Sequence, residues 1–233
     1  VSPALGAHCA EAVFCRPPPQ RARAGEEEFI ATGRAFRVAW RGAELTAWEW
    51  GAGPLIVLAH GWGSRPGRWS VAVPALAGAG FRVVAYDAPA HGRSPGFRAS
   101  LPEFADALSA IAARTGPVHM LVGHSLGGAA AALALTRGLA ADRAVLIAAP
   151  ADPASYADRL AEELGLTTVI RRRMQQNLER RLRTPWDAVH LPSIVRGLAA
   201  PALVIHDRDD AEVPLASAEA IARVWPGAEL MIT

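Results

Sequence analysis

The chain carries Val118-His-Met-Leu-Val122, then Gly123-His-Ser-Leu-Gly-Gly128, then Ala129-Ala-Ala-Ala-Leu-Ala-Leu135. The first run is apolar and β-branched, which is typical of a buried strand, and the last consists of small residues and strong helix formers. Ser125 is therefore expected in the turn between a strand and a helix. In that turn, Gly-x-Ser-x-Gly predicts a reversal so tight that it exposes a nucleophilic hydroxyl. The alternative is a turn with a purely structural role.

The composition is that of an ordinary globular chain of 233 residues, 51% hydrophobic and 20% charged. This length suits one α/β domain with a small insertion. The 24 basic residues are all arginines and face 22 acidic residues, so the net charge of +2 indicates no nucleic-acid-binding surface. Cys9 and Cys15 have a spacing that fits neither a zinc site nor a redox pair, so we expect free thiols. No apolar run reaches the roughly 18 residues of a membrane span, and we expect a cytoplasmic protein.

Residues 1–35 are expected to be a lead-in segment, extended or poorly ordered. Pro17-Pro18-Pro19 and the Arg/Glu-rich run over 21–28 favour this interpretation. The core is predicted over 36–150 and 198–233, with its carboxyl-terminal end missing. It begins with an antiparallel hairpin over 36–50, because apolar and polar residues alternate on both sides of Arg41-Gly42.

The rest of the core alternates strands with helices. Continuous apolar runs predict buried strands at 54–59, 81–86, 118–122, 144–148 and 202–205, and residues 229–232 are expected to start a last strand. Helices are expected at about 69–76, 101–114 and 216–224, besides the one that follows Ser125. This order predicts an α/β fold in which a mostly parallel sheet is flanked by helices on both faces.

Residues 151–197 form an insertion too long for a simple loop, and we expect a small helical cap over the carboxyl edge of the sheet. Asp152-Pro153 predicts the start of its first helix and Gly165 the end. A second helix over 168–183 carries one narrow apolar stripe, formed by Ile170, Met174, Leu178 and Leu182. The arginines on its other faces are interpreted as a solvated surface, while attraction of anionic substrates stays open.

Acyl transfer needs a nucleophile, an acid, a base and donors for the oxyanion. Ser125 is the candidate nucleophile, and the backbone N–H groups of Trp62 and Leu126 are the candidate oxyanion donors. We expect the side chains of Trp62, His124 and Trp186 beside the substrate. The candidate acids are Asp207, Asp209 and Asp210, which follow the 202–205 strand, with Asp152 as an outside alternative.

The base is the missing member. In this architecture the histidine follows the acid, but no histidine follows His206 in the sequence. The others have different interpretations: His60 and His91 lie in turns, His119 begins a strand, His124 should point away from the Ser125 hydroxyl and His8 is near the terminus. His190, in the cap linker, is the one that could move into place.

Four landmarks occur in order: His60-Gly61-Trp62, Asp87-x3-His91-Gly-x-Ser94, Gly123-His-Ser-Leu-Gly-Gly128 and His206-x3-Asp210-x2-Val-Pro214. Over 36–233 the chain thereby resembles the α/β-hydrolase fold superfamily, as a serine-nucleophile, esterase- or lipase-like member. The resemblance implies hydrolysis of a carboxylic ester or thioester by a triad of Ser125, Asp210 and a histidine, with no metal and no organic cofactor. Serine at the turn argues against dehalogenase and epoxide-hydrolase members, which attack with a carboxylate. The missing histidine is expected beyond Thr233, which would make this sequence a fragment.

Two other functions stay open. A non-catalytic domain of this fold could bind a ligand or partner under its cap. Perhydrolysis or carbon–carbon bond hydrolysis would use the same site, because fold does not fix function. The substrate and the oligomeric state are not predicted.

Overall fold

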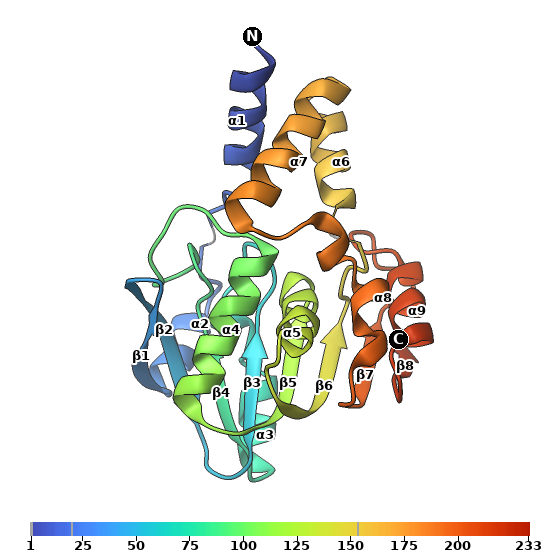
Figure 1. The fold of residues 1–233 in the computed structure, drawn as a ribbon. Helices are drawn as coiled ribbons and strands as arrows, with labels where there is room; N and C mark the ends of the chain where they lie inside the picture. Colours follow the sequence, from blue (N-terminus) through green and yellow to red (C-terminus); the bar gives the residue numbers. More distant parts are fainter. Residues whose placement is uncertain (1, 20, 153) are drawn as a thin grey trace.

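The computed structural model describes residues 2–19, 21–152 and 154–233 and has the predicted α/β architecture (Figure 1). Within these residues one sheet holds eight strands in the order β1-β2-β4-β3-β5-β6-β7-β8. β2 runs antiparallel to β1 and β4, and all the other pairs are parallel. The strands are β1 (Arg34–Trp40), β2 (Ala43–Trp50), β3 (Leu55–Ala59), β4 (Arg82–Tyr86), β5 (Val118–His124), β6 (Ala141–Ile147), β7 (Ala202–His206) and β8 (Glu229–Ile232).

The helices cover both faces of the sheet and its carboxyl edge. They are α1 (Pro3–Phe14), α2 (Glu26–Ala31), α3 (Ala72–Gly78), α4 (Leu101–Thr115), α5 (Leu126–Thr136), α6 (Ser155–Glu163), α7 (Thr168–Leu182), α8 (Leu191–Ile194) and α9 (Leu215–Val224). Short 3₁₀ turns are η1 (Pro66–Trp69), η2 (Trp186–Val189) and η3 (Val195–Gly197). The helix expected near 69–76 is thus divided into η1 and α3. No helix in the described ranges is long and apolar enough to cross a membrane.

The central strand β3 shows why helices lie on both faces. All five of its residues are buried, and they alternate between two cores. Leu55, Val57 and Ala59 pack in the core formed with α4, α5 and α9. Ile56 and Leu58 pack on the opposite side with residues of η1 and α3. Successive side chains of a strand point to opposite faces, so a continuous apolar run is required where both faces are covered.

The amino-terminal hairpin is confirmed. β1 and β2 pair from Arg34↔Glu49 to Trp40↔Ala43, which leaves a two-residue connection. Arg41 and Gly42 both have positive φ, 47° and 77°. This is the geometry that matches the right-handed twist of two antiparallel strands.

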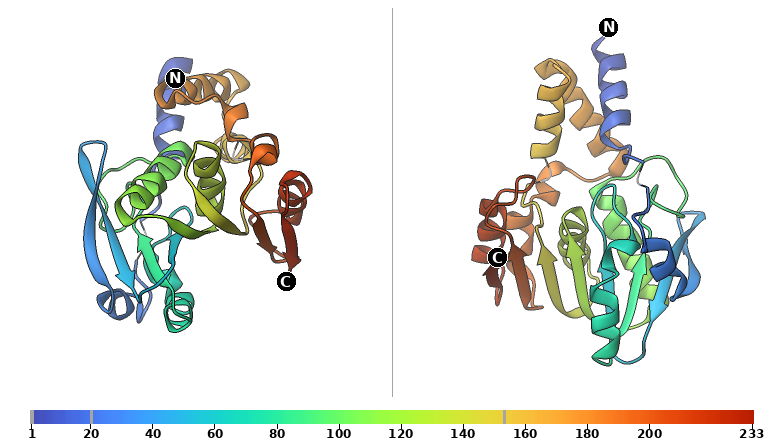
Figure 2. Two further views of the ribbon diagram at one scale, coloured as in Figure 1. Left: turned by 60° about the horizontal axis from the view of Figure 1, so that its bottom comes forward. Right: turned by 180° about the vertical axis from the view of Figure 1, so that it is seen from behind.

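Residues 1–35 differ from the expected extended lead-in, because α1 and α2 lie within them. Pro3 occupies the first turn of α1, and the Ser2 hydroxyl accepts a hydrogen bond from the backbone N–H of Leu5 at 3.3 Å. The helix is held by packing against α7, on which the small residues Ala7 and Ala10 are buried. Figure 2 shows α1, α6 and α7 standing together beyond the carboxyl ends of the strands.

The cap therefore differs from the predicted insertion 151–197 at both ends. It gains α1, and it loses α8 and η3, which pack against α5 and α9 of the core. The first cap helix begins at Ser155, and Pro153, which was expected to open it, lies outside the described residues. The second ends at Leu182, because Arg183 adopts a left-handed conformation with φ 49°.

Candidate active site

Ser125 occupies a sharp turn between β5 and α5. Its φ of 51° and ψ of −123° are strained for a residue with a side chain. The turn is closed by near contact between backbones: a Cβ added at Gly127 would come within 2.3 Å of the Ala59 carbonyl oxygen, and one added at Gly123 within 2.4 Å of the Gly127 carbonyl oxygen. Glycine is therefore required on both sides of the serine.

Ser125 borders a cavity of about 690 Å³ between the core and the cap. Trp62 and Leu126 line it from the core, and Trp186 lines it from the cap linker. Cavities that hold small molecules fall in this size range. Three of the residues expected beside the substrate or the oxyanion are thus brought to the same cavity as Ser125.

The two candidate oxyanion donors lie in turns that flank the serine. Leu126 is the first residue of α5, where backbone N–H groups point out of the helix. Trp62 lies in the turn after β3, and its neighbour Gly61 approaches Ser125 so closely that an added Cβ would be 3.1 Å from the serine Cβ. Among the described residues, neither of these N–H groups has a hydrogen-bond partner.

Two buried histidines fix the turn that contains Trp62. His60 donates from Nδ1 to the Gly61 carbonyl at 2.7 Å and accepts at Nε2 from the N–H of Ala88 at 3.0 Å. His91 accepts at Nε2 from the N–H of Gly63 at 2.9 Å. Burial, together with the neighbouring His91, lowers the pKa of His60 to about 3. Burial also lowers the pKa of His91, so both rings are neutral and can accept these bonds.

Asp210 is held as an ionised carboxylate after β7. Its Oδ1 accepts backbone N–H groups from Glu212 at 2.8 Å and Val213 at 2.9 Å. Partial burial acts to raise the pKa of Asp210, but these two bonds and the nearby His206 and His124 outweigh it and lower that pKa. Glu212, two residues along, lines the same cavity as Ser125.

The alternative acids have local roles. Oδ1 of Asp207 accepts the N–H of Asp209 at 2.9 Å, and Oδ1 of Asp152 accepts the N–H of Ala154 at 2.9 Å. Both are exposed Asx turns, and neither they nor Asp210 are among the described residues that line the cavity. Asp209 is exposed as well.

His124 is not among the residues that line the cavity, in contrast to the expectation that it contacts substrate. Its ring lies beside Gly61, where an added Cβ would be 3.3 Å from Nδ1. Burial lowers the pKa of His124, while the charges of Asp210 and Glu212 act to raise it. The carboxylates whose charge acts on this ring are therefore those of the loop after β7.

In the ranges that the structure describes, none of the seven histidines makes a hydrogen bond with Ser125. His119 pairs with Asp142 at the amino end of β5, and His206 donates to the Val213 carbonyl at 2.7 Å. His190, the one expected to be movable, bonds Ser193 at 2.7 Å. Ser125 lines the cavity, Asp210 lies two residues from the cavity-lining Glu212, and no histidine is among the described residues that line this cavity.

Sequence reasoning missed the contribution of α1 to the cavity. Val13 and Phe14 at its carboxyl end line the same space as Ser125, with Leu178 and Leu182 of α7. The Ser2-Pro3 helix start and the alanines that follow were a usable signal for the helix. No signal linked that helix to the cap, because the contact joins segments more than 150 residues apart.

No group of three or more His, Cys, Asp or Glu side chains in the described part of the chain is placed to hold a metal ion.

Comparison with known proteins connects this geometry to a family. Residues 56–232 match the model of the alpha/beta hydrolase family. A hydrolase from Pseudomonas aeruginosa is similar in structure, with a TM-score of 0.66 at 26% identity over 86% of this chain and 90% of that chain.

Two curated relatives match over short segments. Epoxide hydrolase B of Mycobacterium tuberculosis is 52% identical over 46 residues, which are 20% of this chain and 13% of the relative. Pimeloyl-(acyl-carrier protein) methyl ester esterase of Methylococcus capsulatus is 53% identical over 45 residues, which are 19% of this chain and 17% of the relative. The chain thus spans less than a fifth of the length of each.

Proposed function

Because the chain belongs to the alpha/beta hydrolase family, we propose that it is a serine hydrolase that cleaves a carboxylic ester or thioester through an acyl-enzyme on Ser125. The observation that carries the proposal is the position of Ser125, in a strained turn at the wall of a cavity, beside the N–H groups of Trp62 and Leu126, which have no hydrogen-bond partner among the described residues. A hydroxyl presented in this way is suited to attack on a carbonyl carbon.

The reaction would proceed in two halves. Ser125 Oγ attacks the acyl carbon, its proton passes to a histidine base, and the N–H groups of Trp62 and Leu126 stabilise the oxyanion. Collapse releases the alcohol or thiol, which takes up the proton, and leaves the acyl group on Ser125. Water then attacks with the same base and releases the acid. Asp210, ionised at neutral pH, would orient the histidine and stabilise its charged form.

We propose that this histidine follows Thr233. The backbone of Thr233 bonds to the carbonyl of His206 and to the N–H of Arg208, at 2.9 Å each, beside the turn that carries Asp210. A histidine in the chain that follows would start from the same sheet edge as Asp210. This order of nucleophile, acid and base is the one that the fold uses.

The serine favours ester hydrolysis over the epoxide opening named for one relative. Attack on an epoxide by a carboxylate gives an ester, which water can cleave. Attack by the Ser125 hydroxyl would give an ether, which water does not cleave under these conditions. Acyl chemistry is therefore the turnover that this nucleophile supports.

A fluorophosphonate probe on the full-length protein tests the proposal. We expect covalent labelling at Ser125, found by peptide mass, and hydrolysis of p-nitrophenyl esters that falls at least about 10³-fold in Ser125→Ala. Ser109→Ala, on the remote helix α4, is the matched control and should keep both activities. Absence of labelling in the full-length protein would refute the hydrolase and favour a domain that binds ligands without cleaving them.

A further inference from the structure

The amino-terminal helix α1 is an integral part of the cap. The apolar stripe of α7 packs on it, with Met174 and Leu178 buried in a small core that also contains Ala7 and Ala10. The helices approach closely at Gly6, where an added Cβ would be 3.0 Å from Cδ1 of Ile170. α1 therefore covers part of the apolar stripe of α7.

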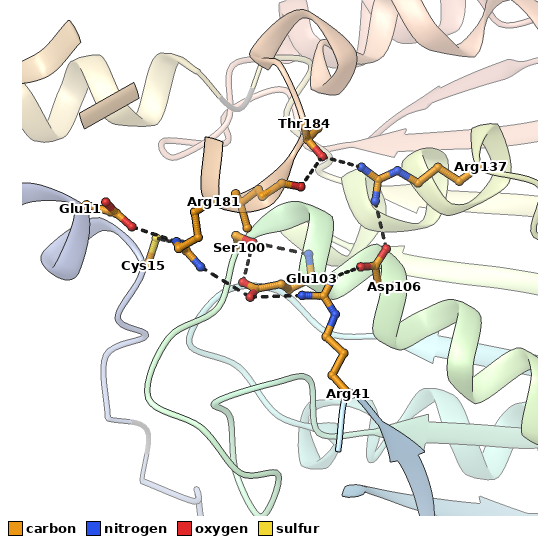
Figure 3. A network of polar contacts seen from close by, with 10 residues as sticks. Glu11, Cys15, Arg41, Ser100, Glu103, Asp106, Arg137, Arg181 and Thr184 are labelled. Atoms are coloured by element: carbon orange, nitrogen blue, oxygen red, sulfur yellow. Dashed lines mark hydrogen bonds and ion pairs between the residues drawn. The ribbon is translucent and has the colours of Figure 1, made fainter. Parts of the chain in front are cut away.

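The carboxyl end of α1 is fixed in place by polar contacts (Figure 3). Nε of Arg181 donates to the buried Glu11 carboxylate at 2.9 Å, and Nη2 lies 3.2 Å from Sγ of Cys15. Nη1 of Arg181 lies 3.6 Å from Oε1 of Glu103, at the start of α4. One guanidinium therefore joins α1, α7 and the core.

A backbone bond completes the attachment. The N–H of Ala99 donates to the Cys15 carbonyl at 2.8 Å, and Ala99 itself lines the cavity. The two residues before Cys15, Val13 and Phe14, are thereby held at the cavity wall.

These two side chains present apolar surface to the cavity. Val13 keeps 52% of its surface exposed, although it is adjacent to buried positions. Phe14, Leu160 and Leu182 each pack against the small core that contains Leu178, and all four side chains line the cavity. Such a wall, continuous with the space at Ser125, suits an alkyl chain.

We propose that α1 determines which acyl chains the site accepts, with Val13 and Phe14 setting the length of a straight, apolar acyl group. This inference rests on the proposed function, because only that function makes the ligand an acyl group. Binding of an alkyl chain at Val13 and Phe14 does not itself require catalysis. Each buried methylene raises the affinity about fourfold. The affinity should therefore increase with chain length until the chain contacts Val13 and Phe14.

The test is calorimetric titration with neutral, uncleavable methyl ketones from 2-pentanone to 2-tridecanone. In the parent protein, affinity should rise by about fourfold per methylene to an optimum length and then level off or fall. Phe14→Ala and Val13→Ala should move the optimum to longer chains, and Phe14→Trp should move it to shorter ones. Leu5→Ala, at an exposed position of the same helix, is the matched control and should leave the optimum unchanged.

Thermal unfolding will show whether each variant is folded. Because Phe14→Ala and Phe14→Trp are expected to shift the optimum in opposite directions, either one alone still tests the inference if the other does not fold. An optimum that is the same in the parent and the folded Phe14 variants would overturn the inference, as would absence of ketone binding to the parent. Hydrolysis is measured separately with p-nitrophenyl esters. Shifted ketone binding without ester hydrolysis would refute the serine hydrolase and retain the role of α1.

Discussion

His91 holds the backbone of Gly63, since its Nε2 accepts the Gly63 N–H at 2.9 Å. The other ring nitrogen donates to a carbonyl in its own loop at 2.8 Å, which fixes the tautomer. The loop after β4 thereby fixes the turn after β3, which contains the Trp62 N–H that we propose as an oxyanion donor. We therefore propose that His91 is a positioning residue for the backbone N–H of Trp62.

His91→Leu removes the acceptor while filling much of the space. We expect kcat for ester hydrolysis by the full-length protein to fall about tenfold with KM changed less than about twofold, because the donor acts in the transition state. His91→Gln, which restores an acceptor, should recover part of the loss. His119→Gln, at the amino end of β5, is the control; an equal loss there would exclude a specific role for His91.

Asp210→Asn tests the choice among the three aspartates after β7. The amide oxygen can still accept the N–H groups of Glu212 and Val213, so the turn should fold. Loss of the charge that supports the histidine should lower kcat about 10³-fold or more in the full-length protein. Asp209→Asn, one residue away and exposed, should remain near the parent rate. The reverse result would move the acid to Asp209.

Gly127→Ala tests the closure of the serine turn. The added Cβ would lie 2.3 Å from the Ala59 carbonyl oxygen and 2.5 Å from that of His60, where backbone cannot yield easily. We expect a loss of more than about 2 kcal/mol in the free energy of unfolding, measured with urea. Gly197→Ala is the control, because its Cβ would meet nothing within 4 Å. Equal stability of the two variants would contradict the close approach.

Arg181→Met tests the attachment of α1. The substitution leaves the Glu11 carboxylate, which is 5% exposed, without its partner. We expect the free energy of unfolding to fall by about 1–3 kcal/mol, and the double variant with Glu11→Gln to recover part of the loss. Arg173→Met, on an exposed face of α7, is the matched control. A loss in the control as large as that in Arg181→Met would show that the contact is not specific.

The buried histidines make stability depend on pH. Folding lowers the pKa of His60 from 6.5 to about 3, so below pH 6.5 the unfolded chain binds a proton that the folded protein does not. The free energy of unfolding should therefore fall as the pH is lowered from 6.5 toward 3, by at most about 1.4 kcal/mol per pH unit for this one proton. Burial also lowers the pKa of His91, which acts in the same direction.

Asp87 opposes this trend at lower pH. Burial raises the pKa of its carboxyl from 3.8 to about 6, so the folded protein holds a proton between these values that the unfolded chain releases. Its stabilising contribution is present below pH 3.8 and is lost as the pH rises through 6. In urea titrations between pH 4 and 7, His60→Asn should make the free energy of unfolding less dependent on pH. Asp87→Asn should make it fall more steeply as the pH is lowered below 6. Parallel curves for the parent and both variants would contradict these assignments.

The elements predicted from sequence were those whose pattern is local. The alternation around Arg41-Gly42 and the continuous apolar run of β3 each report the burial of neighbouring residues, so the hairpin and the central strand could be placed directly. The turn at Ser125 was likewise contained within six residues. The extended lead-in was wrong, because the three prolines that favour an extended chain lie after α1, while Ser2-Pro3 before it starts a helix.

The amino-acid sequence by itself determined the alternation of strands and helices from residue 36 onward, the turn that presents Ser125 and the aspartates available after β7. These features depend on side-chain periodicity and on glycines at positions where neighbouring backbone leaves no room for a Cβ. Only the tertiary structure decided that α1 completes the cap, that Val13 and Phe14 reach the cavity, and that His60 and His91 act as neutral acceptors. Each of these features depends on contacts between segments that are distant in sequence. Local propensity does not encode such contacts, because they stabilise the fold only after the intervening chain has closed around a shared core.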